Sequence, residues 1–233
     1  SGNSTSFTVT ASGTISGYQW QVSTNGGVTY TNITSSGSNP VYSGFNTATL
    51  SLSGTTVSNN GYLYRCVVTG PVPPDAVSNA ALLTIQVSPS ITVNPVPSTI
   101  CAGANTNFSV TASGDVSSYQ WQVSTNGGVT YTNITSSGSN PVYSGYNTAT
   151  LSLSGTIVSN NGYLYRCLVS GPCTPNALSA AALLNVNAVL PVSVSISANP
   201  GTTICSGTSV TFTASPTNGG GSPVYQWKVN GTN

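Results

Sequence analysis

Few side chains in this sequence could carry out acid–base or nucleophilic chemistry. The 233 residues include no histidine, and the only two acidic residues are Asp75 and Asp115. The basic residues are Arg65, Arg166 and Lys228. A glycosidase needs two carboxylates about 5–10 Å apart, and a serine or cysteine nucleophile needs a base to activate it. We therefore expect no catalytic residues and interpret the chain as a protein that is not an enzyme.

Metal, cofactor and nucleic-acid sites are not expected either. Zinc needs clustered cysteine or histidine ligands, and no Cys-x-x-Cys pair occurs. Calcium needs several carboxylate or carbonyl oxygens, which two isolated aspartates do not provide. Three cations are too few to neutralise the phosphates of a nucleic acid. The composition therefore predicts no cofactor and no nucleic-acid partner.

Aromatic side chains near amide side chains are the remaining candidates for a binding site. An exposed ring can stack on a sugar, and asparagine and glutamine can bond to its hydroxyl groups. Aromatics are also ordinary strand residues that pack at sheet edges, and we favour this second interpretation. The candidates for glycan binding or packing are Tyr30, Tyr42, Phe45, Tyr131, Tyr143 and Tyr146.

The segment STNGGVTY, residues 23–30, predicts a turn between two strands. Asn25 and Gly26 form one of the strongest sequence signals for a β-hairpin. The segment also resembles the Asp-box hairpin of secreted β-proteins, with Asn25 in place of the aspartate and Tyr30 in place of the tryptophan. In that motif the side chains stabilise the hairpin, so the resemblance implies a structural turn.

The elements that must position these residues are repeated along the chain. Residues 18–44 recur letter for letter at 119–145. The segment VSNNGYLYRC begins at Val57 and occurs again beginning at Val158. A third copy begins near Thr202 and includes YQWKV. We predict three domains: repeat 1 (1–86) without its first strand, repeat 2 (87–187) complete, and repeat 3 (188–233) with only its N-terminal part. The proline-rich segments 86–97 and 187–200 are expected to be short, stiff connectors.

Each repeat is predicted to consist of short antiparallel strands. Segments such as YQWQVS and ATLSLSG alternate apolar and polar residues, and Gly, Asn, Ser and Pro separate them. No segment has helical periodicity. Roughly seven strands per 100 residues is typical of a β-sandwich. The predicted fold class is all-β, a semi-rigid string of tandem antiparallel β-sandwiches.

Particular positions resemble immunoglobulin-like domains. The tryptophan of YQWQV stands where those domains bury a strand-C tryptophan, and YLYRC resembles their tyrosine corner and strand-F cysteine. Val9 and Val110 replace the strand-B cysteine, so the usual disulfide between the sheets cannot form. The resemblance implies that the core of the fold includes Trp20, Tyr64, Trp121, Tyr165 and Trp227.

The sequence pattern ICAG…FSVTASG…YQWQVSTNGG…YRCVVTG is similar to the tandem repeats of large secreted surface proteins of Bacteroidetes bacteria. Those proteins include gliding-motility adhesins and other cargo of the type IX secretion system. This resemblance implies a secreted, cell-surface structural or adhesive protein without enzymatic activity. With charged residues at only 2%, little repulsion opposes self-association into a fibre or sheath. The alternative function is a carbohydrate-binding accessory repeat of a secreted enzyme, with surface glycans as partners. No apolar run is long enough for membrane insertion.

Because the resemblance implies export, disulfides are expected. The candidates are Cys66, Cys101, Cys167, Cys173 and Cys205. One alternative pairs Cys101 with Cys167, although the nine positions between Cys101 and Val110 would span roughly 30 Å of extended chain. A second pairs Cys173 with a cysteine that the repeat alignment places just before Ser1, which would link neighbouring repeats. A third leaves the thiols free.

Overall fold

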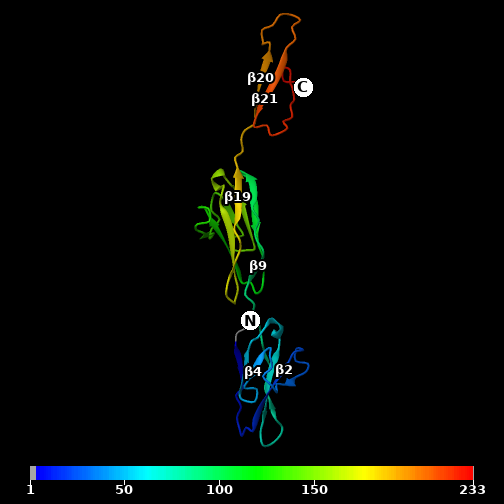
Figure 1. Ribbon diagram of the computed structural model, residues 1–233, viewed down its shortest axis with the longest axis vertical. Coiled ribbons are helices and arrows are strands. Elements are labelled where there is room, and N and C mark those ends of the chain that lie inside the picture. The colour runs from blue at the N-terminus through cyan, green and yellow to red at the C-terminus, as the bar shows by residue number, and fades with distance from the viewer. Residues whose placement is uncertain (1–3, 233) are drawn as a thin grey trace.

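The computed structural model describes residues 4–232. Figure 1 shows three bodies in a row along one long axis, which correspond in order to repeats 1, 2 and 3. The first described residues, Ser4 and Thr5, lie near the first junction, and β20 (Ser193–Asn199) and β21 (Thr211–Thr217) lie in the last body. Among residues 4–232, the regular structure consists of strands and two 3-10 helices. The predicted all-β class is therefore confirmed, whereas the domain boundaries stay predictions.

Repeat 1 folds as two sheets. Its elements are β1 (Thr5–Thr8), β2 (Gly17–Ser23), β3 (Thr31–Asn32), β4 (Val41–Ser43), β5 (Thr49–Ser53), the 3-10 helix η1 (Val57–Asn59), β6 (Leu63–Thr69), β7 (Ala76–Val77) and β8 (Ala81–Leu82). One sheet has the order β1-β5-β4 and the other β3-β2-β6-β7, with β8 also paired to β6. These pairings are antiparallel.

Repeat 2 has the same arrangement with additional strands at its start. Its elements are β9 (Ser90–Val93), β10 (Ser98–Cys101), β11 (Thr106–Ser109), β12 (Thr111–Ser113), β13 (Ser118–Ser124), β14 (Thr132–Asn133), β15 (Val142–Ser144), β16 (Thr150–Ser154), the 3-10 helix η2 (Val158–Asn160), β17 (Leu164–Ser170), β18 (Ala177–Leu178) and β19 (Ala182–Asn187). The sheets have the orders β11-β16-β15, β12-β9 and β10-β19-β17-β13-β14, and β18 pairs with β17. The β10–β19 pairing is parallel, unlike the antiparallel expectation, because the chain changes sheets between β9 and β10.

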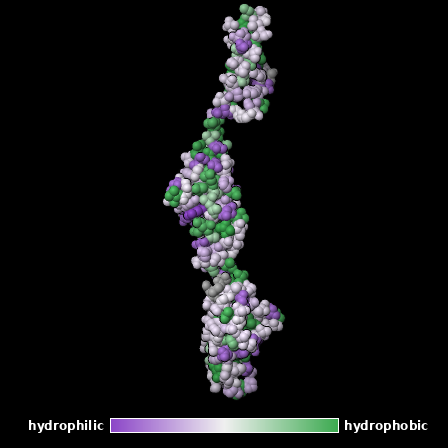
Figure 2. Space-filling view, in the orientation of Figure 1, coloured by the Kyte–Doolittle hydropathy of each residue, from purple (hydrophilic) through white to green (hydrophobic). Residues whose placement is uncertain are grey.

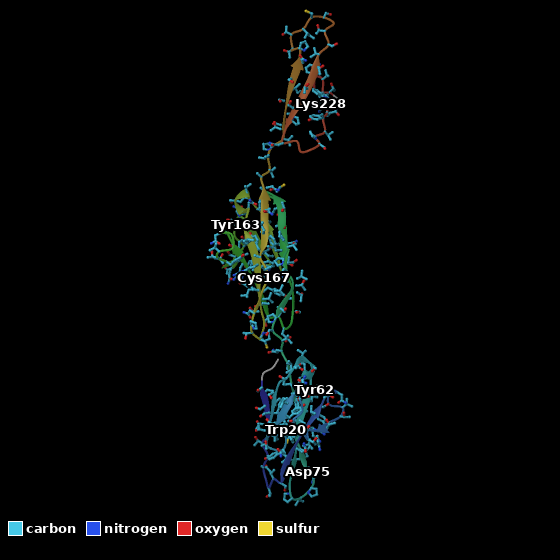
Figure 3. All side chains as sticks on the ribbon, in the orientation of Figure 1. Trp20, Tyr62, Asp75, Tyr163, Cys167 and Lys228 are labelled. Carbon is cyan, nitrogen blue, oxygen red and sulfur yellow. The ribbon has the colours of Figure 1, made fainter. Side chains whose placement is uncertain are left out.

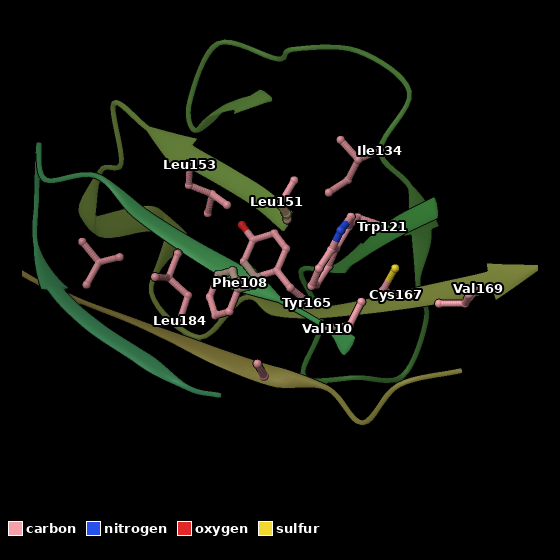
Figure 4. Packing of buried hydrophobic residues seen from close by; sticks show 12 residues of the cluster. Phe108, Val110, Trp121, Ile134, Leu151, Leu153, Tyr165, Cys167, Val169 and Leu184 are labelled. Carbon is pink, nitrogen blue, oxygen red and sulfur yellow. The ribbon is translucent and has the colours of Figure 1, made fainter. Parts of the chain in front are cut away.

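Strict alternation explains why these strands bury one face. In β17 every second residue is buried, and its inward residues include Tyr165 and Cys167. Trp121 is also fully buried, and its Nε1 donates a hydrogen bond to the Thr148 carbonyl at 2.9 Å. Tyr165 stacks on Phe108 with ring centroids 4.9 Å apart. Figure 4 shows these side chains packed between the sheets, and repeat 1 has a matching core around Trp20 and Tyr64.

Repeat 3 is a two-stranded sheet of β20 (Ser193–Asn199) and β21 (Thr211–Thr217) among the described residues. Its Trp227, expected in a core, is 47% exposed, and its Phe212 is 55% exposed. The matching residues Trp121 and Phe108 are 0% and 1% exposed. In repeat 2 a second sheet covers those residues, and no second sheet lies over them in the described part of repeat 3. Trp227 is therefore half-exposed among the described residues, and its place in a core stays a prediction.

The junction between repeats 1 and 2 is very short. The Ile85 amide donates to Asn60 Oδ1 of repeat 1 at 2.8 Å. The Val87 amide donates to Asp115 Oδ2 of repeat 2 at 2.7 Å, and the Asp115 amide donates back to the Val87 carbonyl at 3.0 Å. Only Gln86 lies between these anchors. The segment 86–97, expected to be a connector, contains β9, the first strand of repeat 2.

The junction between repeats 2 and 3 is longer. The Val186 amide is held by Asn161 Oδ1 at 2.9 Å. The next side-chain anchor is Asn218, whose Nδ2 donates to the Pro191 carbonyl at 3.0 Å. Residues 188–190, which follow β19, are exposed, and Figure 1 shows a bare connection between repeats 2 and 3. The two junctions therefore differ in how tightly they hold the neighbouring repeats.

Candidate functional site

The hairpin of residues 23–30 is held by its own side chains. Asn25 Oδ1 accepts hydrogen bonds from the Ser23 hydroxyl at 2.9 Å and the Thr29 amide at 3.0 Å. Its Nδ2 donates to Thr29 Oγ1 at 2.8 Å. The Gly27 amide donates to Ser23 Oγ at 2.9 Å. Because the polar groups of Asn25 are used within the turn, this residue serves the hairpin rather than a ligand.

Next to each hairpin, four side chains form a network on the outer face of the sheet. Gln21 on β2 lies opposite both Asn32 on β3 and Arg65 on β6. Arg65 Nε donates to Gln21 Oε1 at 2.7 Å, and Gln21 Nε2 donates to Asn32 Oδ1 at 2.8 Å. The Arg65 guanidinium lies 3.8 Å from the centroid of the Tyr30 ring. We call these four residues the arginine–tyrosine network.

Repeat 2 has the same network, built from Gln122, Tyr131, Asn133 and Arg166. Arg166 lies 3.7 Å from the Tyr131 ring centroid and donates to Gln122 Oε1 at 2.8 Å. Gln122 Nε2 donates to Asn133 Oδ1 at 2.8 Å. The network therefore recurs with the same geometry, as its identical sequence requires.

The tyrosine of the network lies close to its own hairpin. A Cβ placed on Gly27 would lie 3.3 Å from Tyr30 Oη, and Gly27 has a φ of +89°. One side of the Tyr30 ring is in contact with Arg65, so the ring is not free on both faces. The network offers amide, guanidinium and phenol groups to solvent with modest aromatic area. This chemistry suits hydrogen bonding to a sugar or to another protein surface.

The other four aromatic candidates face the interior. Tyr42 packs against the repeat 1 core, and its hydroxyl lies 3.4 Å from the Tyr64 hydroxyl. Burial raises the pKa of Tyr42 above its usual value. Phe45 packs against the same core, and Tyr143 and Tyr146 repeat this arrangement in repeat 2. Of the six candidates, only Tyr30 and Tyr131 belong to an outer-face network.

The cysteines are free thiols in the structure, which corrects the expected disulfides. All five candidates lie within the described residues and none is paired. Cys66 and Cys167 are fully buried, and burial raises the pKa of the Cys167 thiol to about 11. Figure 4 shows Val110 beside Cys167, where a strand-B cysteine would be needed. Cys205 lies exposed in the segment between β20 and β21.

The pairing of Cys101 with Cys167 is wrong for a topological reason. β19 lies between β10, which ends at Cys101, and β17, which contains Cys167. Cys101 is level with Asn187, whereas Tyr165 is level with Ala182. Cys167 is therefore level with a position seven residues before Asn187, which is roughly 23 Å along the strand. A disulfide requires Cα atoms within about 7 Å.

Cys173 lies at the first junction. It lines a hollow of about 170 Å³ together with residues of repeat 1, among them Thr5, Thr55 and Gln86. The loop after β17 therefore faces the end of the preceding repeat. The cysteine expected before Ser1 lies outside the described residues.

The charged residues do not gather into a site. Asp115 anchors the first junction, whereas Asp75 lies at the opposite end of repeat 1 (Figure 3). Lys228 lies in repeat 3. Among residues 4–232 no group of three histidine, cysteine, aspartate or glutamate side chains is placed to hold a metal ion. The roles of Gln21, Asn32 and Asp115 were not predicted from the sequence. For the network a signal was available, because Gln21 and Arg65 each alternate with inward-facing residues of their strands and so lie on the outer face.

Hydrophobic and hydrophilic residues are interspersed over the visible surface, as Figure 2 shows. The visible surface therefore shows no single large patch that would mark one binding site by itself.

In the described part of the chain, no helix is long and apolar enough to cross a membrane.

Comparison with known proteins identifies the fold. No protein-family model and no curated protein sequence matches the chain. Among solved structures, it is similar to the titin I-band fragment I67–I69, with a TM-score of 0.50 and 13% identity over 80% of this chain and 60% of the fragment. It is also similar to DIP-gamma IG1+IG2 (TM-score 0.45, 16% identity, 72% of this chain and 83% of that one). A four-domain Dscam1 structure matches at a TM-score of 0.47 and 17% identity, over 80% of this chain and 42% of that one. Identities this low show the fold alone: the chain is an all-β protein of tandem immunoglobulin-like domains.

Proposed function

We propose that the chain is a structural and adhesive repeat segment of a large secreted cell-surface protein, of the Bacteroidetes adhesin type, and that it contributes to an extracellular fibre or sheath. In this role the segment provides length, and each repeat presents the same outer sheet face. The observation that carries the proposal is the end-to-end arrangement of repeats 1 and 2, with a single residue between their anchors.

The short junction supports a spacer role because it limits bending. A flexible linker would let neighbouring domains take many orientations. Here, Ile85 is bound within repeat 1, Val87 is bound to repeat 2, and Cys173 faces repeat 1 across the junction. A force applied at one end of repeat 1 would therefore be transmitted to repeat 2 with little bending at the junction.

The surface composition supports self-association. With two acidic and three basic residues in 233, neighbouring chains experience little electrostatic repulsion. Lateral contacts would instead use the amide and hydroxyl groups that cover the sheets. The secreted bacterial setting rests on the sequence resemblance in the repeated YQWQVSTNGG and YRC segments.

Small-angle X-ray scattering of the full chain tests the spacer role. We expect an extended particle in which repeats 1 and 2 keep one orientation, while repeat 3 adds flexibility through residues 188–190. Negative-stain microscopy at increasing protein concentration tests fibre formation. A compact particle, or independent tumbling of repeats 1 and 2 in NMR relaxation, would refute the spacer.

A carbohydrate-binding accessory role is the second candidate, and the arginine–tyrosine network favours it. The test is a glycan array with the Tyr30→Ala/Tyr131→Ala double variant, which removes both network rings. The matched control is Val28→Ala/Val129→Ala, since these residues are 81% exposed at the tips of the same hairpins. Binding that is lost only in the tyrosine variant supports this role, and an array without any signal rejects it.

A further inference from the structure

The guanidinium groups of Arg65 and Arg166 carry positive charges that no carboxylate among residues 4–232 neutralises. Asp115 is bound to a backbone amide at the first junction. Asp75 directly precedes β7, which pairs with the end of β6, and four positions along β6 separate that level from Arg65, roughly 13 Å. In repeat 2 the position that matches Asp75 is Asn176. Each network therefore contains an unpaired cation.

Each arginine also dictates which way the neighbouring amides point. Arg65 Nε can only donate a hydrogen bond, so Gln21 presents its Oε1 at 2.7 Å. The amide nitrogen of Gln21 then faces Asn32 and donates to its Oδ1 at 2.8 Å. The same chain of bonds recurs in repeat 2. Because both amide oxygens accept bonds within the network, the polar groups that remain for a ligand are mainly donors.

The remaining donors lie on the outer face of the sheet. Arg65 is bonded through Nε, and its two Nη groups have no hydrogen-bond partner among residues 4–232; the same holds for Asn32 Nδ2. Asn32 is exposed and Arg65 is half-buried. The Tyr30 ring lies 3.8 Å from the guanidinium and covers one of its faces. The free pair of Nη groups matches the two oxygens that a carboxylate or a sulfate presents.

The network holds the arginine in place before a ligand arrives. A free arginine side chain loses rotamer freedom when it binds a partner, but Arg65 is already restrained by Gln21 and by the Tyr30 ring. A preorganised group loses less entropy on binding. Half-burial also lowers the local dielectric constant, which strengthens the attraction between the guanidinium and an anion. These features distinguish the network from a solvated surface arginine.

We propose that each arginine–tyrosine network binds the anionic group, a carboxylate or a sulfate, of an acidic polysaccharide. The anion bonds to the two Nη groups, and the amide nitrogen of Asn32 or Asn133 donates to an adjacent sugar oxygen. A sugar polymer suits the site better than a protein, because protein interfaces have a buried apolar centre. The exposed residues on either side of Tyr30, Thr29 and Thr31, are polar.

This inference rests on the carbohydrate-binding candidate for the function and names the class of its ligand. An uncharged sugar would leave the guanidinium without a counter-ion, whereas an acidic sugar supplies one. The scarcity of charge elsewhere in the chain makes this attraction local, since Lys228 is the only other basic side chain.

The two networks lie on opposite sides of the long axis. In Figure 1 the segment that follows β2 (blue) projects to one side of repeat 1, and the segment that follows β13 (green) projects to the other side of repeat 2. These segments contain the network tyrosines, Tyr30 and Tyr131. Because the first junction is short, one straight glycan does not reach both networks. The chain is therefore arranged to cross-link two acidic polysaccharide chains.

Nuclear magnetic resonance of the full chain tests each site separately. Arg65 and Arg166 are the only arginines, so their two Nε–H resonances report the two networks directly. Titration with an oligogalacturonate, which carries carboxylates, should shift both resonances in a saturable way. The methyl ester of the same oligosaccharide is the neutral control and should bind at least tenfold more weakly. Dextran sulfate against dextran repeats the comparison for sulfate.

The variant Gln21→Glu gives Arg65 a carboxylate of nearly the same shape inside the network. It should weaken oligogalacturonate binding at repeat 1 at least tenfold and leave repeat 2 unchanged, which also controls for folding. Lys228→Gln removes a cation outside both networks and should change neither site. Unchanged binding at repeat 1 in Gln21→Glu, or equal weakening by Lys228→Gln, would overturn the proposal.

Light scattering with long polygalacturonate tests the cross-linking. The original chain should form large particles, and Gln21→Glu, with one functional site, should not. Binding without particles would overturn the cross-linking part of the proposal. Poly-glutamate that binds as tightly as oligogalacturonate would show that the site does not select a sugar and would overturn the ligand class.

The outcomes separate this inference from the proposed functions. Equal binding of the acid and its methyl ester overturns the anionic ligand and leaves a carbohydrate-binding role standing. No shift with oligogalacturonate or dextran sulfate up to millimolar concentration also overturns the inference, while neutral glycans on the array still test the broader role. X-ray scattering tests the spacer role without any glycan.

Discussion

Replacing Asp115 by alanine should loosen the junction between repeats 1 and 2. The Asp115 carboxylate accepts a 2.7 Å hydrogen bond from the Val87 amide. A bond to a charged acceptor contributes about 1.5–3 kcal/mol, and the exposure of Asp115 to solvent reduces this to about 1 kcal/mol. The backbone bond from the Asp115 amide to the Val87 carbonyl remains. A loss of about 1 kcal/mol corresponds to roughly fivefold more frequent opening of this segment.

Hydrogen exchange at residue 87 measures that opening directly. We expect roughly fivefold faster exchange in Asp115→Ala, a smaller change in Asp115→Asn, and no change in the core amides of β17. Asp75→Ala is the matched control, since Asp75 is the other acidic residue and lies at the far end of repeat 1 (Figure 3). If the amide of residue 87 exchanges at the same rate in Asp115→Ala as in Asp75→Ala, the Asp115 carboxylate does not hold the junction.

Three further predictions concern the turn, the core and pH. Asn25→Ala removes the hydrogen bonds that close the hairpin and should lower the free energy of unfolding by about 1 kcal/mol; an unchanged urea midpoint would contradict the role of the turn. Leu151→Ala removes a fully buried side chain and should cost about 2–5 kcal/mol, measured by urea denaturation, with repeat 1 unaffected. The pKa of Cys167 is raised by burial to about 11, so the buried neutral thiol contributes its full stabilisation below about pH 9 and loses it as pH rises towards 11. The loss in the free energy of unfolding should approach about 3 kcal/mol. In Cys167→Ala the free energy of unfolding should depend less on pH in this range, and the same pH dependence in the variant and the original chain would contradict the role of Cys167.

Strand identity was predictable because it depends on local pattern. The alternation in residues 63–69 places every second side chain inward, and the structure buries Tyr64, Cys66 and Val68 accordingly. The hairpin at Asn25 was predictable for the same reason, since its hydrogen bonds join residues no more than four positions apart. Such features need only the preferences of neighbouring residues.

The aromatic candidates could not be separated from the sequence. Tyr30 and Tyr42 are both tyrosines in the same repeated segment, yet Tyr42 packs against the core and Tyr30 lies against Arg65. Which way each ring points depends on strands more than twenty residues away. The burial of a tryptophan such as Trp121 likewise depends on distant residues, because a core requires a second sheet over the first.

The connector at residues 86–97 illustrates the same limit. Prolines led to the prediction of a connector over this whole segment, but Ser90–Val93 within it forms a strand that pairs with β12. The cysteines are a further case, since the wrong pairing of Cys101 with Cys167 followed from ignoring the strand that separates them.

The sequence by itself determined the class of the protein: its repeats, its alternating strands, its hairpin turns and the scarcity of chemically reactive side chains. These properties depend on residue type and on spacing over a few positions. The tertiary structure alone decided which tyrosines reach the surface, that Cys101 and Cys167 lie too far apart to pair, and how short the first junction is. Each of these depends on which distant strands become neighbours, and that information arises only when the sheets pack together.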